Sequence, residues 1–240
     1  MVVQHNMAAS NANRQLGIST NTLSKSTEKL SSGYRINRAA DDAAGLSISE
    51  KMRSQIRGLN KASSNAQDGI SAIQTAEGAL NEAHSILQRM NELATQSAND
   101  TNTTADRTAV QSEVNALTNE LSRIASTSQF NTQNLLDGTF TGKNLQVGAL
   151  ENQKITISIG TMNAKALGVD SLDVKSFTKA GSAMTLIQKA ISKVSGQRSD
   201  LGALQNRLEH TVNNLDNISE NTQTAESRIR DTDMASEMVQ

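Results

Sequence analysis

The stretch that decides the fold is residues 52–94, "MRSQIRGLNKASSNAQDGISAIQTAEGALNEAHSILQRMNELA", in which apolar residues recur with a period of seven. One column of this repeat consists of Met52, Leu59, Ala66, Ile73, Leu80, Leu87 and Ala94. Three residues further on lies a second column of Ala62, Gly69, Ala76, Ala83 and Met90. A narrow apolar stripe at heptad spacing is typical of a long helix that packs against partner helices. We therefore predict one helix from about Gly45 to Ser97, roughly 80 Å long at 1.5 Å per residue.

The partner helices are expected in the same chain, because the spacing returns in two later segments. The first contains Val110, Val114, Leu117, Leu121 and Ile124, and the second contains Ile187, Val194, Leu201, Leu208 and Leu215. The predicted rod core comprises Met52, Leu59, Ile73, Leu80, Leu87, Leu117, Leu121, Val194, Leu201, Leu208 and Leu215. Each such side chain contributes about 1.5–3 kcal/mol when it is buried, so packing between the segments is expected to stabilise the bundle.

The composition supports the same fold class. Aromatic residues make up 2% of the chain, proline is absent, and Ala, Leu, Ile, Val and Met supply nearly all apolar side chains. Between the helical segments, "NTQNLLDGTF" (131–140) contains an Asp-Gly turn, and "KNLQVGALENQKITISIG" (143–160) has the alternation of a β-hairpin. We predict a mainly α fold: an elongated antiparallel helical bundle or coiled-coil rod with a small β-hairpin patch.

The polar residues do not converge on a catalytic or metal site. The three histidines, His5, His84 and His210, lie in separate segments, and the chain has no cysteine. The pair Asp41-Asp42 is interpreted as a helix cap. The stretch "DTDMASE" (231–237) lacks the central glycine of a calcium loop and is interpreted as a helical turn. We expect no enzymatic activity, no cofactor and no metal.

Charge and hydropathy argue against two further classes of partner. The formal net charge is -1, with basic and acidic residues interspersed, so we expect no nucleic-acid binding. No apolar run approaches the roughly 18 residues that a membrane span needs, so we expect no membrane insertion. The first twenty residues lack the basic start and apolar core of a cleaved secretory signal.

Several blocks closely resemble the bacterial flagellins, in the style of the clostridial type. They include "KLSSGYRINRAADDAAGLSISEKMRSQIRGL" (29–59), "TSQFNTQNLLDG" (127–138) and "LGALQNRLEHTVNNLDNISENTQTAESRIRDTDMASEM" (201–238). The resemblance covers residues 1–140 and 182–240. It implies a structural subunit of the flagellar filament that serves motility, is secreted and polymerises outside the cell through its terminal helices.

The resemblance also implies a division of the chain. Residues 1–44 correspond to the N-terminal half of the inner domain with a connecting spoke. Residues 45–181 correspond to the N-terminal part of the middle, rod-like domain with the hairpin region and a short link in place of outer domains. Residues 182–225 supply the C-terminal rod helix, and residues 226–240 begin the C-terminal part of the inner domain.

Flagellins continue beyond "MASEMV" with a terminal helix that pairs with the amino-terminal helix, whereas this sequence stops at Gln240. We therefore expect residues 1–33 to be poorly ordered in the isolated protein and filament assembly to be defective. The residues expected to act in polymerisation are Val2, Leu16, Leu23 and Leu30.

The partners implied by the resemblance are other flagellin subunits, a flagellar export chaperone, the filament cap and Toll-like receptor 5. The implied receptor-binding residues are Gln88, Arg89, Leu93 and Glu113, with a contribution from Arg207. An arginine suits such an interface because its planar fork can form paired hydrogen bonds. The alternative interpretation is that Leu93 and Glu113 serve only packing and solvation of the helices.

Two other functions remain open at this point. A hook–filament junction protein shares flagellin-like ends, and it would be present in few copies per flagellum. A helical adaptor or signalling rod would fit the heptads as well, and it would stay inside the cell.

Overall fold

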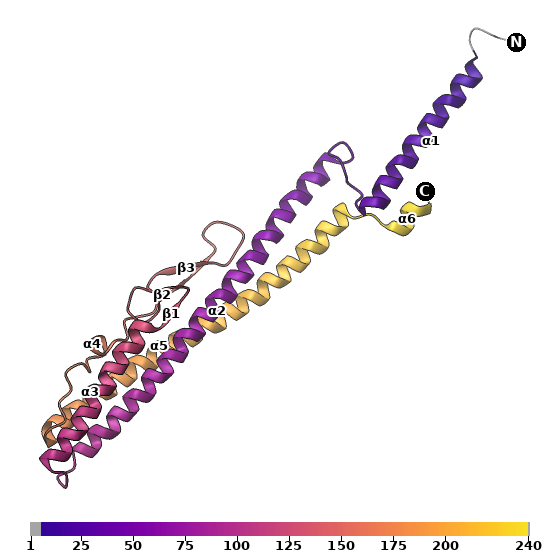
Figure 1. Cartoon of the computed structure of the whole chain (residues 1–240). Coiled ribbons are helices and arrows are strands. Elements are labelled where there is room, and N and C mark those ends of the chain that lie inside the picture. Colours follow the sequence, from indigo (N-terminus) through magenta and orange to yellow (C-terminus); the bar gives the residue numbers. More distant parts are fainter. Residues whose placement is uncertain (1–5, 240) are drawn as a thin grey trace. The chain divides into compact units, whose positions relative to one another are not determined.

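The computed structural model describes residues 6–239, which fall into two compact units (Figure 1). Residues 1–60 and 216–240 form what we call the terminal unit, and residues 61–215 form the bundle unit. The helices are α1 (Met7–Ser32), α2 (Ala43–Ser97), α3 (Thr104–Thr127), α4 (Ala164–Leu167), α5 (Phe177–Arg230) and α6 (Met234–Val239). The strands are β1 (Gln129–Phe130), β2 (Gln133–Asn134), β3 (Lys143–Gln146) and β4 (Lys154–Ile157).

In the bundle unit, α2 runs antiparallel to α5. Glu77 of α2 lies 3.6 Å from Arg198 of α5, and Thr95 donates a hydrogen bond to Met184 Sδ at 3.3 Å. Residues later in α2 therefore contact residues earlier in α5, as in an antiparallel pair. Arg89 of α2 pairs with Glu113, so α3 packs beside the same half of α2. The predicted antiparallel bundle with a small β patch is confirmed.

The predicted heptad columns form the core of the bundle unit. Ile73, Leu80, Leu87, Leu121, Val194, Leu201 and Leu208 are fully buried, and Leu215 is nearly so. Leu117 differs, because it is only partly buried at the edge of this core. Within the terminal unit, Leu59 is buried but Met52 is only half-buried. Ala76, Ala83 and Met90 of the second column are also buried. The small side chains of the two alanines let the helices approach closely.

The third side of the α2–α5 pair is covered by two different structures. The helix α3 covers one half and ends at Thr127, and two antiparallel hairpins, β1–β2 and β3–β4, follow it. Asn65 of α2 donates a hydrogen bond to the Gln146 carbonyl of β3 at 3.1 Å, which places the second hairpin over the earlier part of α2. The predicted hairpin in residues 143–160 is confirmed, whereas the short hairpin β1–β2 was not predicted. Its turn residues, Asn131 and Thr132, both have positive φ.

The link between β4 and α5 is a packed segment. Val169, Leu172 and Val174 are buried within the core of the bundle unit. Two polar side chains hold the link to the helices: Gln111 bonds to the Leu172 carbonyl and the Val174 amide, each at 2.8 Å, and Ser97 donates to the Val174 carbonyl at 2.5 Å. The short link thus closes the bundle at this end.

In the terminal unit, residues 7–32 form the helix α1. The expectation that residues 1–33 are poorly ordered in the isolated protein stays a prediction. Both ends of α1 are capped. The Asn6 side chain accepts a hydrogen bond from the Ala9 amide, and Gly33 takes a left-handed conformation (φ 75°) while its amide bonds to the Lys29 carbonyl. Such caps satisfy groups that a helix end leaves unpaired. The predicted residue Val2 lies outside the described residues.

The end of α5 and the short α6 also belong to the terminal unit. Helix α5 ends at Arg230 because Asp231 pairs with Tyr34 in a β-bridge, and the Thr232 amide bonds to the Gly33 carbonyl. The next helix begins after Asp233, whose carboxylate accepts hydrogen bonds from the amides of Ala235 and Ser236. Residues 231–237 were interpreted as a helical turn, and this holds for residues 234–237 of α6, whereas residues 231–233 precede the helix. Asp42 likewise accepts from the Gly45 amide at the start of α2.

Candidate functional site

The described residues do not form a cluster of metal-ligating side chains. His84 and His210 lie on different helices, and within residues 6–239 no three His, Cys, Asp or Glu side chains are grouped to hold a metal ion. None of the helices in this part of the chain is long and apolar enough to cross a membrane.

A polar patch on the bundle unit contains most of the predicted receptor-binding residues. Arg89 projects from α2 with half of its side chain exposed, and it donates two hydrogen bonds to Glu113 of α3 at 2.9 and 3.0 Å. It also pairs with Glu92 one helical turn on, at 3.2 Å. Gln88 is exposed beside it and its amide nitrogen lies 3.0 Å from His84 Nε2. We call Gln88, Arg89, Glu92 and Glu113 the Arg89 patch.

The two carboxylates fix the guanidinium in one orientation. Hydrogen bonding to Glu113, and then to Glu92, raises the pKa of Arg89 above its ordinary value. An arginine is charged at any physiological pH, and the two carboxylates hold its fork pre-aligned on the surface. Glu92 was not predicted as a member of this patch. Its i, i+3 spacing from Arg89 was the available signal.

Two of the predicted receptor-binding residues lie elsewhere. Leu93 is only 2% exposed, since it packs into the core beneath the patch. Arg207 is exposed on α5, next to Leu208, whose side chain lies against Gly69 of α2. Gly69 and Arg89 are about 30 Å apart along α2 at 1.5 Å per residue. The structure thus brings Gln88, Arg89 and Glu113 together, places Leu93 under them, and leaves Arg207 at a separate level of the bundle.

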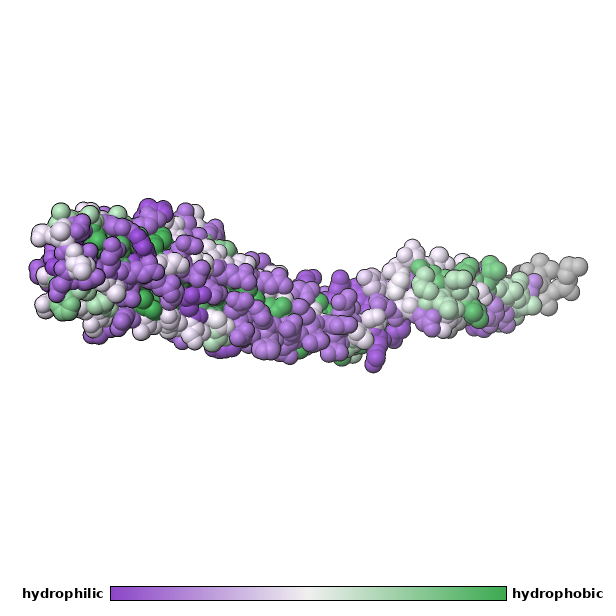
Figure 2. All heavy atoms as spheres, turned by 90° about the horizontal axis from the view of Figure 1, so that it is seen from below, coloured by the Kyte–Doolittle hydropathy of each residue, from purple (hydrophilic) through white to green (hydrophobic). Residues whose placement is uncertain are grey.

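The second surface is the apolar face of α1. Leu16 and Leu23, predicted to act in polymerisation, are 68% and 67% exposed and lie on the same side of the helix. Met7 and Ile18 are exposed as well, but on its opposite side. Leu30 is only partly buried, near α6, where Lys29 forms an ion pair with Glu237 at 3.3 Å. Green side chains gather at the right of Figure 2, where α1 and α6 lie. Large apolar side chains gathered on one exposed helix face are the mark of a surface that another chain covers.

The chain is similar to known proteins along its whole length. A family model described as the bacterial flagellin N-terminal helical region matches residues 3–141, and one described as the bacterial flagellin C-terminal helical region matches residues 184–240. The chain is 56% identical to a flagellin of Halalkalibacterium halodurans over 242 residues, covering 100% of this chain and 89% of that protein. It is 42% identical to a flagellin of Clostridium tyrobutyricum, covering 99% and 93%.

A solved structure is similar too. The crystal structure of Bacillus cereus flagellin superposes with a TM-score of 0.56 at 32% sequence identity, over 63% of this chain and 88% of that one. The similarity in sequence therefore comes with similarity in the arrangement of helices.

Proposed function

The chain belongs to the bacterial flagellin family, and from this premise we propose how its surfaces serve a filament. It is a structural subunit of the bacterial flagellar filament, and it serves motility. The observation that carries this function is the match of both flagellin helical regions together with full-length relatives at 56% and 42% identity. Those relatives are flagellins, which favours the filament subunit over a hook–filament junction protein or a signalling rod.

The function is tested in a motile bacterium whose own flagellin gene has been removed. Producing this chain as the sole flagellin should yield filaments in sheared preparations viewed by electron microscopy, with the chain as their main protein. The defect in assembly expected from the sequence would make these filaments shorter or fewer than those of the strain's own flagellin. Retention of the chain inside the cells with no filaments would contradict the assignment.

We propose that polymerisation uses the apolar face of α1, through Leu16, Leu23 and Leu30, with Val2 continuing the same column. The chain is secreted, and an export chaperone would cover this face before assembly, while the filament cap would receive the emerging subunit. In the sequence, residues 1–44 and 226–240 supply the inner domain of the filament, and 45–181 with 182–225 supply the middle domain. The chain acts through these contacts and catalyses no reaction.

We further propose that the Arg89 patch binds Toll-like receptor 5. The support is the exposed Arg89, whose guanidinium Glu113 and Glu92 hold in place, together with the motif "QRMNEL" (88–93). An arginine that is already oriented loses little conformational entropy on binding. Leu93 contributes from the core of the bundle unit, where it holds α2 in position. Arg207 contributes from α5, at a place on the bundle away from the Arg89 patch.

The test is charge reversal at Arg89. Arg89→Glu should weaken binding to the receptor ectodomain by about 30-fold or more, as expected for an interface hot spot. Arg123→Glu is the matched control, because Arg123 is a similarly exposed arginine of α3 that pairs with Glu120. Equal affinities of the two variants in surface plasmon resonance would exclude the Arg89 patch as the receptor site. Arg207→Glu, measured alongside, tests whether Arg207 also contributes to receptor binding.

A further inference from the structure

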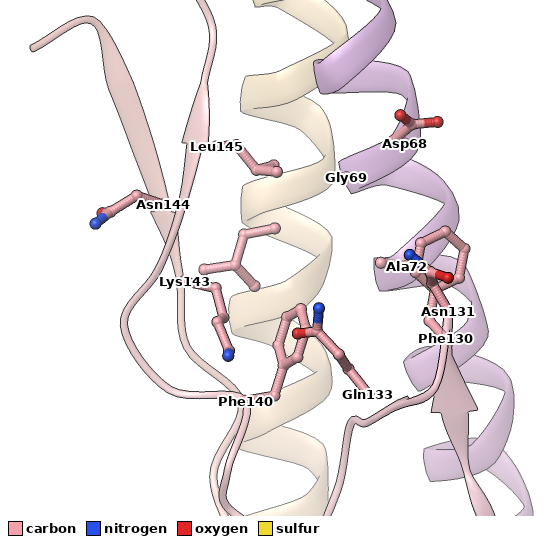
Figure 3. A pocket seen from close by; sticks show the side chains of 11 residues that line it. Asp68, Gly69, Ala72, Phe130, Asn131, Gln133, Phe140, Lys143, Asn144 and Leu145 are labelled. Atoms are coloured by element: carbon pink, nitrogen blue, oxygen red, sulfur yellow. The ribbon is translucent and has the colours of Figure 1, made fainter.

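An open apolar pocket lies in the bundle unit where α3 gives way to the two hairpins. Figure 3 shows that one hairpin flanks the pocket on each side, in front of the long helices. Its volume is about 230 Å³, and its apolar lining comes from Ala72, Phe130, Phe140, Leu145 and Ile157. A cavity of about 150 Å³ is enough for benzene, so this pocket has room for one aromatic ring.

The pocket gathers aromatic surface in a chain that has very little of it. Phenylalanine occurs three times in the sequence, and two of the three, Phe130 and Phe140, line this pocket. The floor on α2 is formed by Gly69 and Ala72, which have little or no side chain. Leu145 of β3 takes the space over Gly69, whereas the small side chain of Ala72 leaves room above it. The pocket therefore offers an apolar floor beside two aromatic rings.

A cation without a carboxylate partner stands at the rim of the pocket. Lys143 of β3 is exposed, and its Nζ lies 5.8 Å from the centre of the Phe140 ring. Among residues 6–239 its ammonium group forms no ion pair. The carboxylate of Asp68 is also at the pocket, but it points away from Lys143 in Figure 3. A negative charge on a ligand is therefore favoured at the Lys143 side of the rim.

A neutral hydrogen-bond donor comes from the other hairpin. Gln133 of β2 lines the pocket, and Figure 3 shows its side-chain amide beside the Phe140 ring. The amide nitrogen can donate to an oxygen atom of a ligand. A mostly apolar wall with a few polar groups that fix the orientation of the ligand is typical of small-molecule sites.

We propose that this pocket binds a small aromatic carboxylate of about the size of phenylacetate. The ring would lie over Ala72 against Phe130 and Phe140, where contacts between aromatic rings add to the burial of apolar surface. The carboxylate would pair with Lys143 and accept a hydrogen bond from Gln133. The single charge at the rim matches the single charge of the ligand. This binding goes beyond the filament function and does not depend on it.

Ligand-observed NMR with the full-length chain tests the proposal, with phenylacetate as the probe. Phenethylamine has the same ring and the opposite charge, and acetate has the same charge without the ring. Phenylacetate should bind about five-fold more tightly than phenethylamine, as expected for one exposed ion pair, and acetate should give no saturation transfer. The proposal would be overturned if phenylacetate does not bind, or if either of the other two compounds binds as tightly.

Two lysine variants test whether the ligand lies at this pocket. Lys143→Gln should weaken phenylacetate binding about five-fold and should not weaken the binding of phenethylamine. Lys154→Gln is the matched control, because Lys154 is also exposed and lies at the other end of the same hairpin, where it pairs with Gln146. Equal affinities of the two variants for phenylacetate would overturn the proposal.

Ala72→Leu tests whether the ring enters the pocket. A leucine side chain at this position would occupy the floor, so the variant should lose phenylacetate binding. Circular dichroism shows whether the variant keeps its helices and its thermal midpoint. Binding that persists in the folded variant would overturn the proposal, and if the variant does not fold, the comparison of the two lysine variants decides.

Discussion

At the residue scale, the buried amide of Gln111 holds together parts of the bundle that are far apart in sequence. It is 7% exposed, and it supplies both a donor and an acceptor to the link, at the Leu172 carbonyl and the Val174 amide. Asn115 accepts from the same amide nitrogen at 2.9 Å. A buried backbone group is costly to leave unpaired, so this one side chain allows an irregular segment to be packed against α3.

We predict that Gln111→Ala lowers the free energy of unfolding by about 2–4 kcal/mol, because two backbone groups lose their partner. Urea unfolding followed by circular dichroism measures the loss. Gln188→Ala, an exposed glutamine of α5, is the control and should change stability little. If both variants unfold at the same urea concentration, the link is held by apolar packing alone.

Two glycines of α2 should respond to alanine in opposite ways. A Cβ at Gly78 would meet no atom within 4 Å, so Gly78→Ala should stabilise the protein by about 0.5–1 kcal/mol through helix propensity. A Cβ at Gly69 would overlap Leu145 of the hairpin, with Leu208 in contact behind it. Gly69→Ala should therefore displace Leu145 and be less stable than Gly78→Ala by about 1–2 kcal/mol. Equal thermal midpoints would show that the hairpin does not need the glycine.

At the element scale, helix starts depend on carboxylates that are better hydrogen-bonded in the folded state. Asp106 and Thr103 form a capping box at the start of α3. The hydrogen bond from the Thr103 hydroxyl, followed by that from its amide, lowers the pKa of Asp106 below 3.8. Hydrogen bonds from Ser236 likewise lower the pKa of Asp233 at the start of α6.

The sign of the resulting pH dependence follows from these shifts. The unfolded state binds the proton more readily, so the contribution is complete above pH 3.8 and declines as the pH falls below that value. We predict that Asp106→Asn is less stable than the parent at neutral pH and that the difference shrinks in acid. Asp200→Asn, in the middle of α5, is the control. Urea midpoints measured across this range provide the check, and a difference that does not change with pH would contradict the prediction.

The helices could be predicted from the sequence because their information is local and periodic. The column from Leu59 to Ala94 sets both the helix and its buried face, and the alternation in residues 154–157 sets β4. The link could not be predicted, because its order comes from Gln111 and Ser97, which are distant in sequence. The Arg89 patch was predicted only in part. Arg89 and Glu113 were named from the resemblance to flagellins, whereas the burial of Leu93 depends on how α2 is rotated against α3.

At the scale of the whole molecule, the two units differ in how far they bury their apolar side chains. The bundle unit buries its heptad columns within itself, from Ile73 to Leu208. In the terminal unit, α1 has a single buried residue, Ser26, and Leu16 and Leu23 are exposed. A filament subunit needs both properties: a part that folds by itself, and a face that is satisfied only by other subunits.

This difference predicts that assembly and folding can be separated by mutation. Leu16→Asp together with Leu23→Asp should raise the concentration needed for polymerisation at least about ten-fold, because each leucine buried in the polymer contributes about 1.5–3 kcal/mol. The urea midpoint of the monomer should not change, since both side chains are exposed in it. Asn11→Asp with Asn21→Asp adds the same charge on the other side of α1 and serves as the control. Pelleting assays and electron microscopy measure the polymer. If the leucine variant polymerises like its control, the subunits are joined by surfaces other than the apolar face of α1.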